Sequence, residues 1–243
     1  MSDLTIVAPP GGWGPPWPLV VEVSAALPVG SWVLVGGLMV QLQARAAGID
    51  EVRTTDDVDA LVDVMGTGVT VLFVASRLRD LGFEVVEPGW DDASAHRLRR
   101  GTDVVDLLVA DHLPKHKRPQ LAGRAVLATE GGAQALARTQ RVTVIDGDTH
   151  VELAVPDLLG ALVLKAAAHA ADSRDRGRHL RDAALLAALI TDHLRELARL
   201  QGSDRKRLLR LRDALADPQQ DAWLLLPEGL RQRGQDTIRI LAE

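Results

Sequence analysis

The sequence predicts an α+β fold in two parts, a mixed-sheet N-terminal half over residues 1–154 and a helical C-terminal half over residues 155–243. Three observations lead to this prediction. Short apolar runs that end at glycine, typical of strands, alternate with helical segments before residue 155. After it, apolar and amphipathic segments follow helical spacing throughout. The chain of 243 residues is also long enough for one large domain or two small ones.

The composition excludes several kinds of protein and several kinds of functional site. Hydrophobic residues at 47% and charged residues at 25% are average for a globular protein. The absence of cysteine excludes disulfides, thiolate zinc sites and a cysteine nucleophile, so oxygen or imidazole must bind any metal. There is no apolar run of the ~18 residues that a membrane span needs, and no secretory signal pattern. We therefore expect a cytoplasmic protein with no membrane segment.

The first 18 residues, rich in proline and glycine, are expected to form no element. Leu19–Ala26 could begin a helix. Trp32–Val35 then reads as a strand, Gly36-Gly37 as a turn and Leu38–Ala46 as a helix. A glycine pair at such a junction lets a ligand approach the backbone, and the helix N-terminus attracts phosphate. The alternative is an ordinary tight turn.

Two carboxylates define the next strand, which we predict over Val52–Val64. Asp57 and Asp59 share one face because strand side chains alternate, whereas Asp56 falls on the other face. Like charges so close are costly unless a bound cation compensates them, so the pair indicates a divalent metal site. A solvated acidic edge strand is the alternative, which the apolar neighbours disfavour.

A third carboxylate interrupts a buried strand. Thr67–Gly82 reads as a helix and Phe83–Val86 as a strand, and Val104–Val109 follows as an apolar run that contains Asp106. A lone buried carboxylate costs several kcal/mol unless it is paired or holds a metal. Asp106 is thus either the third ligand of the same metal site or the partner of a nearby arginine.

The later elements are a hairpin and a helical bundle. The hairpin turns at Asp146-Gly147-Asp148. The predicted helices are Leu158–Ala171, Asp182–Leu200, Asp204–Leu215 and Asp221–Leu241. Lys165 lies in the most apolar of these helices, where it must either reach the surface or serve an anionic partner. Basic clusters at 96–100, 115–118 and 205–212 suit phosphate contacts, although the net charge is -5.

Taken in order, these residues resemble the DNA polymerase β-type nucleotidyltransferase superfamily and, within it, the AbiEii-like (MenT-type) toxins of bacterial toxin–antitoxin systems. The resemblance spans residues 32 to about 190, and the last fifty residues carry no recognisable motif. The residues that carry it are Gly36-Gly37, Arg53-x-Thr55-x-Asp57-Val58-Asp59, Val105-Asp106-Leu107-Leu108, Lys165 and Arg181-Asp182.

The resemblance implies a reaction in which a hydroxyl attacks the α-phosphate of a nucleoside triphosphate and pyrophosphate leaves. It implies two Mg²⁺ ions held by Asp57, Asp59 and Asp106, with Asp106 helping to deprotonate the hydroxyl. Lys165 would neutralise the triphosphate, and Asp182 would orient Lys165 or the nucleotide. The remaining implied contacts are Gly36 and Gly37, which would cradle the triphosphate, and Arg53 and Thr55, which would brace the strand or touch phosphate.

The resemblance also implies partners. The expected acceptor is RNA, at the 3′ end of tRNA, and a toxin would have a cognate antitoxin protein. Three alternatives stay open at this point. The acceptor is a small hydroxyl compound, as in aminoglycoside nucleotidyltransferases; the protein is an inactive binding module of the same fold; or the motif is coincidental in an unrelated α/β domain with a helical extension.

Overall fold

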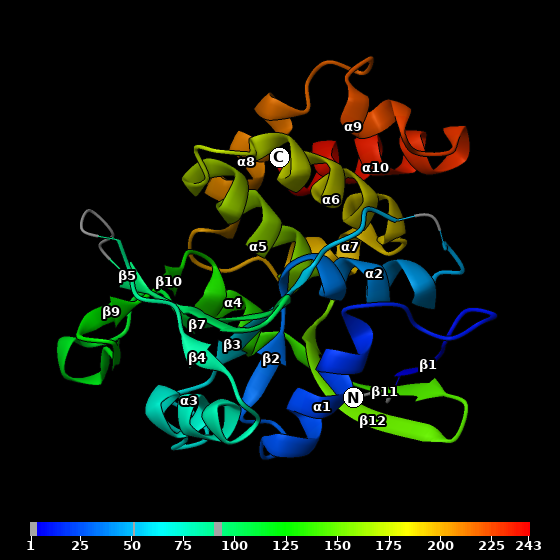
Figure 1. The fold of residues 1–243 in the computed structure, drawn as a ribbon. Coiled ribbons are helices and arrows are strands. Elements are labelled where there is room, and N and C mark those ends of the chain that lie inside the picture. The colour runs from blue at the N-terminus through cyan, green and yellow to red at the C-terminus, as the bar shows by residue number, and fades with distance from the viewer. Residues whose placement is uncertain (1–3, 51, 90–93) are drawn as a thin grey trace.

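The computed structural model describes residues 4–50, 52–89 and 94–243. The helices of the C-terminal half lie together above the sheets of the N-terminal half (Figure 1). The first half consists of β1 Leu4–Val7, α1 Trp17–Ala26, β2 Trp32–Leu34, α2 Gly36–Ala46, β3 Asp57–Val62, α3 Val71–Asp80, β4 Glu84–Val85, β5 Ser94–Ala95, β6 Arg97–Arg100, β7 Asp103–Ala110, the 3₁₀ turn η1 Lys115–Lys117, β8 Gln120–Leu121, β9 Arg124–Val126, β10 Ala128–Thr129, α4 Gly132–Ala137, β11 Thr139–Asp146 and β12 Thr149–Pro156. The second half consists of α5 Leu158–Ala171, α6 Arg176–Leu189, α7 His193–Ala198, α8 Asp204–Ala214, α9 Asp221–Leu224 and α10 Glu228–Leu241.

The central sheet has the strand order β2-β3-β7-β6-β4, and β10 pairs with the far end of β7. Strands β3 and β7 run parallel, while the other neighbours along this order run antiparallel. The apolar side chains of β3 and β7 form the strands because they fill the core on both faces of the sheet. The parallel register sets Asp59 opposite Asp106, which decides the geometry of the site below.

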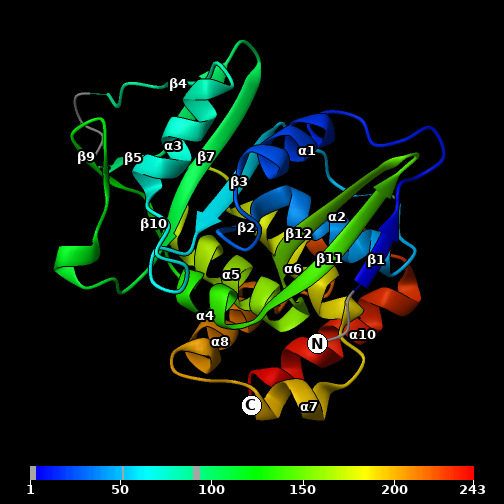
Figure 2. The same cartoon turned by 90° about the horizontal axis from the view of Figure 1, so that it is seen from below.

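The N-terminal segment corrects one expectation. Residues 4–7 form β1, which pairs in parallel with β11, and Trp17 already belongs to α1. The pairing joins segments from opposite ends of the first half, so no local sequence pattern predicts it. Together β1, β11 and β12 form a second sheet, and Figure 2 shows the long β11–β12 hairpin beside β1. A third, small sheet has the order β5-β9-β8.

The predicted helix Asp182–Leu200 is wrong at both ends. Helix α6 begins already at Arg176, since the Asp175 carboxylate caps it by accepting the backbone N–H of Arg178. It ends at Leu189, and Asp192 caps the separate helix α7. Capping aspartates thus set both starts.

Further boundaries also differ. The predicted helix Thr67–Gly82 begins only at Val71, because the Thr70 hydroxyl caps α3 by accepting the backbone N–H of Phe73. The predicted helix Asp221–Leu241 is divided into α9 and α10, because Pro227 lacks the N–H that a continuous helix would need there. The predicted strand Val52–Val64 pairs only over Asp57–Val62. The hairpin and α5 lie where the sequence predicts them, and α2 begins at Gly36, two residues before the predicted start at Leu38.

The two halves share apolar contacts. One buried cluster fills the space between the central sheet, α1 and α3. A second cluster joins Val33 and Met39 of the first half to Leu162 and Leu186 of α5 and α6. The strands end at Pro156, close to the predicted boundary, and the division into two domains stays a prediction. Among the described residues, no helix combines the length and apolarity that crossing a bilayer requires.

Candidate metal centre and its cleft

Three carboxylates from two neighbouring strands converge. Asp57 and Asp59 project from the same face of β3, and Asp106 projects from β7 beside them because the two strands run in parallel register. One oxygen of each carboxylate lies within 4.8 Å of the others. This arrangement has the donor type and spacing that a divalent cation requires.

An arginine also binds this cluster. Arg97 lies on β6 directly opposite Asp106 and makes a bidentate pair with it, Nε to Oδ1 at 2.8 Å and Nη2 to Oδ2 at 2.7 Å. Its Nη2 lies 3.7 Å from Oδ2 of Asp57. The hydrogen bond to Asp106 raises the pKa of Arg97 above its usual value, although burial opposes it. Asp106 therefore satisfies both sequence hypotheses, as a member of the cluster and as the partner of an arginine.

The cluster keeps an excess of negative charge, and this excess raises the pKa of Asp59. Burial, together with the neighbouring carboxylates of Asp57 and Asp106, raises the pKa of Asp59 to about 7. Lys165 and Arg178 counteract this rise only in part. A bound divalent cation would supply the missing positive charge. The residues present therefore fit a metal ion.

The glycine pair is required by its packing against these side chains. Gly36 has a φ of +70°, and a Cβ there would lie 1.7 Å from Oδ2 of Asp59. A Cβ on Gly37 would lie 2.7 Å from Cβ of Thr55. Thr55 in turn donates a hydrogen bond from Oγ1 to Oδ1 of Asp57 at 2.8 Å. The turn that starts α2 thus encloses the strand carboxylates, and no larger residue fits.

The opposite wall of the cleft carries a buried ion pair. Nζ of Lys165 on α5 lies 2.7 Å from Oδ2 of Asp182 on α6, and both residues are buried. Nη2 of Arg53 reaches the same carboxylate at 3.4 Å. Burial opposes ionisation of Asp182, but the charges of Lys165 and Arg53 outweigh it and lower the pKa of Asp182. Lys165 serves an anionic partner, and that partner is Asp182.

The α5–α6 joint adds Asp172 and His179, which sequence reasoning missed. The Asp172 carboxylate accepts hydrogen bonds from the backbone N–H of Arg174 at 2.7 Å and from Nη2 of Arg178 at 3.1 Å. Nε2 of His179 lies 3.0 Å from Asp172 as well. The bond from Arg174 is the main cause that lowers the pKa of Asp172, while burial lowers the pKa of His179. The sequence signal for this joint is the run of charged residues between 173 and 181.

These two walls enclose one cavity of about 660 Å³. Its lining includes the three carboxylates and both glycines on the sheet side, and Lys165, Arg174 and Arg178 on the helical side. Asp182 lies behind Lys165 and does not line the cavity. The lining residues belong in part to β7, β10, α5 and α6, and Figure 1 shows the helices α5 and α6 above the strands β7 and β10. A cavity with acidic and basic walls suits a ligand that combines phosphates with a metal ion.

The comparisons with known proteins concern the fold. No protein-family model and no curated protein sequence matches the chain. Among solved structures, the chain is similar to an antigenic nucleotidyltransferase-like protein from Paracoccidioides brasiliensis, with a TM-score of 0.50 and 21% identity. The alignment covers 82% of this chain and 88% of that protein. The chain has a nucleotidyltransferase-like fold. The predicted α+β fold class is thereby confirmed.

Proposed function

We propose that this protein is a metal-dependent nucleotidyltransferase, which transfers a nucleoside monophosphate from a nucleoside triphosphate to an acceptor hydroxyl. The observation that carries the proposal is the convergence of Asp57, Asp59 and Asp106 on a cavity whose other wall includes Lys165, Arg174 and Arg178. The nucleotidyltransferase-like fold supports it.

Asp57, Asp59 and Asp106 would hold the metal, and we propose Mg²⁺ in a two-metal site because hard cations prefer carboxylate oxygens. When bound, the metal neutralises charge on the phosphates and on the departing pyrophosphate. Arg97 keeps Asp106 oriented through its bidentate pair. Thr55 does the same for Asp57 through its hydroxyl.

In the transfer, the acceptor oxygen forms a bond to the α-phosphorus, and the bond from that phosphorus to the α,β-bridging oxygen breaks. Pyrophosphate leaves with the electron pair, and the acceptor proton passes to a cleft carboxylate. Both oxygens of Asp106 are engaged by Arg97. No hydrogen bond or ion pair with a described residue engages the Asp59 carboxylate, so Asp59 has an oxygen open to this proton.

The triphosphate would lie between the glycine turn and the helical wall. Gly36 and Gly37 leave room for phosphate close to the backbone. Lys165 already shares Asp182 with Arg53. Arg174 lines the same cavity and forms no ion pair with any described residue, so it would supply positive charge for the outer phosphates, while Asp172 partly neutralises Arg178 beside it.

For the acceptor we propose RNA, with transfer to the 3′ end of tRNA by a toxin that a cognate antitoxin protein controls. The resemblance of the motifs to AbiEii-like toxins supports this proposal. An aminoglycoside-like acceptor is the second candidate, because the uncompensated carboxylates of the sheet wall would attract a cationic compound.

The test is incubation with each α-labelled triphosphate, Mg²⁺ and total RNA, followed by a gel. Labelled RNA is expected with the wild type and is lost with Asp57→Ala. Asp56→Ala is the matched control, because this exposed neighbour lies outside the cluster and should keep full activity. Labelling that survives Asp57→Ala, or no labelling with any triphosphate, would contradict RNA transfer. A parallel reaction with an aminoglycoside tests the second candidate.

A further inference from the structure

One exposed segment has a charge opposite to that of the whole protein. From His112 to Thr129 the chain contains no Asp or Glu, while it contains Lys115, Lys117, Arg118 and Arg124. We call residues 112–129 the cationic arm. The net charge of the complete chain is -5, so the arm concentrates positive charge in a chain that is acidic elsewhere.

The cations of the arm have no acidic partners. All four side chains are exposed, and none forms an ion pair with any residue that the structure describes. Of the arginines that line the cleft, Arg53, Arg97 and Arg178 are paired with carboxylates, and Arg174 is the exception among the described residues. Exposed cations without partners, gathered on one segment, are the electrostatic pattern of a polyanion site.

The arm presents these charges from a fixed scaffold. Leu113, Leu121 and Val126 are buried in the core cluster that also contains α3. Strands β8 and β9 pair with each other, and β9 pairs with β5. The turn η1 is closed by the backbone N–H of Lys117, which donates to the carbonyl of Pro114. The lysines of η1 therefore keep a defined spacing. In Figure 1 the arm extends outward from the sheet beside β9.

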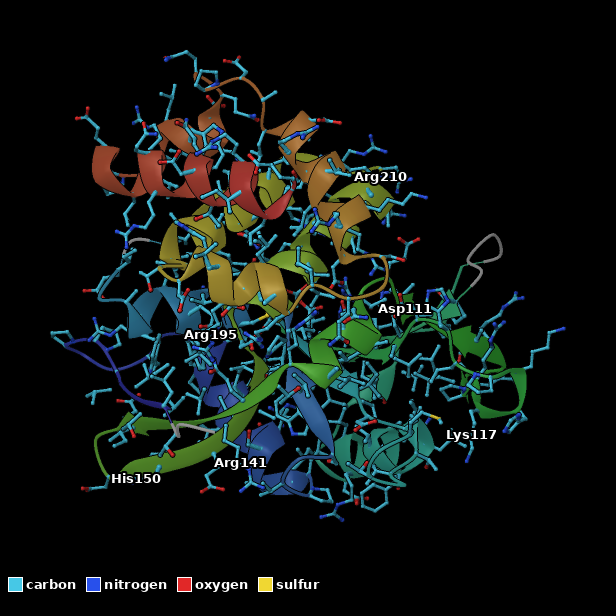
Figure 3. All side chains as sticks on the ribbon, turned by 180° about the vertical axis from the view of Figure 1, so that it is seen from behind. Asp111, Lys117, Arg141, His150, Arg195 and Arg210 are labelled. Atoms are coloured by element: carbon cyan, nitrogen blue, oxygen red, sulfur yellow. The ribbon has the colours of Figure 1, made fainter. Side chains whose placement is uncertain are left out.

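Both ends of the arm lead to the cleft. The arm begins just after β7, the strand of Asp106, and it ends in β10, where Ala128 and Thr129 line the cavity. Asp111 at its base is paired with Arg207 of α8 at 3.1 Å. Figure 3 shows Lys117 and Arg210 on the same side of the molecule, with Asp111 between them. A nucleic-acid strand bound along the arm from η1 to β10 would therefore end beside the cavity that the three carboxylates line.

We propose that the cationic arm binds the phosphate backbone of a single-stranded RNA acceptor and guides its terminal hydroxyl into the cleft. This inference rests on the proposed nucleotidyl transfer and specifies its acceptor. The arm would repel a cationic small acceptor. The chain has no tyrosine and only 3% aromatic residues, so binding depends on backbone charge more than on base stacking.

The test is fluorescence anisotropy with a fluorescein-labelled 20-nucleotide RNA in EDTA, without nucleotide, across a salt series. The arm variant is Lys115→Ser/Lys117→Ser. The matched control is Arg141→Ser/Arg195→Ser, which removes the same charge from exposed positions that Figure 3 shows away from the arm. The arm variant is expected to bind about tenfold more weakly, with a log–log salt slope smaller by about 1.4, because each lost contact removes about 0.7. The control should change affinity less than twofold.

Equal weakening in both variants, or no RNA binding by the wild type at low salt, would overturn the inference. Calorimetric titration of each variant with Mg²⁺ and a triphosphate shows separately that the cleft is intact. Arg124→Ser provides a second, single-site check and is expected to reduce the salt slope by about 0.7. If RNA binds through the arm but no triphosphate is ever transferred, the proposed reaction fails while the binding result stands.

Discussion

The two walls of the cleft handle charge in opposite ways. On the sheet wall, Arg97 pairs with Asp106 and Asp57, whereas Asp59 has no ion pair with a described residue, and burial and the neighbouring carboxylates raise its pKa. On the helical wall, the Asp182 carboxylate is paired with both Lys165 and Arg53. The carboxylates of the sheet wall therefore need a bound cation to balance their charge. On the helical wall, the protein's own side chains already balance the charge of Asp182.

The largest expected effect is a loss of stability when the Asp182 carboxylate of the helical wall is removed. Asp182→Ala leaves Lys165 and Arg53 without their carboxylate, and uncompensated buried charge costs about 3–5 kcal/mol in the free energy of unfolding. Lys165→Ala should cost clearly less, because Arg53 still neutralises Asp182. Urea unfolding of both variants measures the difference. A greater loss in Lys165→Ala would mean that the carboxylate does not organise this wall.

The next expected effect is a gain in stability when a carboxylate of the sheet wall is neutralised. Asp59 has a pKa of about 7 in the folded protein and an ordinary value near 4 in the unfolded chain. The folded state therefore holds a proton that the unfolded state releases, and metal-free stability from this group is lost as pH rises from about 4 through 7. Asp59→Asn lacks this loss and should exceed the wild type by about 2–4 kcal/mol at pH 8.

The difference should vanish near pH 4, and unfolding curves in EDTA across this pH range measure it. Asp56→Asn is the control, since this neighbouring carboxylate is exposed and lies outside the cluster. A wild type that is as stable as Asp59→Asn at pH 8 would show that the sheet wall carries no excess charge.

A smaller expected effect tests whether the glycine turn must stay close to the carboxylates of the sheet wall. Gly36→Ala and Gly30→Ala both place a side chain at positive φ, which costs about 1–2 kcal/mol. Only the Cβ at position 36 meets Asp59, whereas position 30 has open space. Mn²⁺ affinity, measured by calorimetry, should fall at least about tenfold in Gly36→Ala and stay unchanged in Gly30→Ala. Equal Mn²⁺ affinity in both variants would show that the turn at Gly36 does not affect metal binding.

The sheet wall could be predicted from sequence because its signals are local. The alternation of Asp57 and Asp59 on a strand and the lone Asp106 in an apolar run each imply a compensating charge wherever they lie. The glycine turn is also a local pattern. The Lys165–Asp182 contact followed from the family resemblance, and the structure places the two side chains 2.7 Å apart.

The remaining features depend on contacts between distant segments. Arg97 reads as one member of a basic run, and only the antiparallel register of β6 on β7 sets it opposite Asp106. Strand β1 exists through its pairing with β11. The Asp172–His179 contact requires the start of α6 at Arg176, which the charge pattern did not indicate. Register and capping decide these cases, and neither follows from periodicity.

The most direct test of the central claim is calorimetric binding of a non-hydrolysable triphosphate with Mg²⁺ and with EDTA. The sheet wall is expected to need the metal before it accepts the triphosphate, so the wild type and Asp56→Ala should bind only in Mg²⁺. Asp57→Ala should lose this metal-dependent binding. Equal binding in Mg²⁺ and EDTA, or full metal-dependent binding by Asp57→Ala, would contradict a metal centre at Asp57, Asp59 and Asp106.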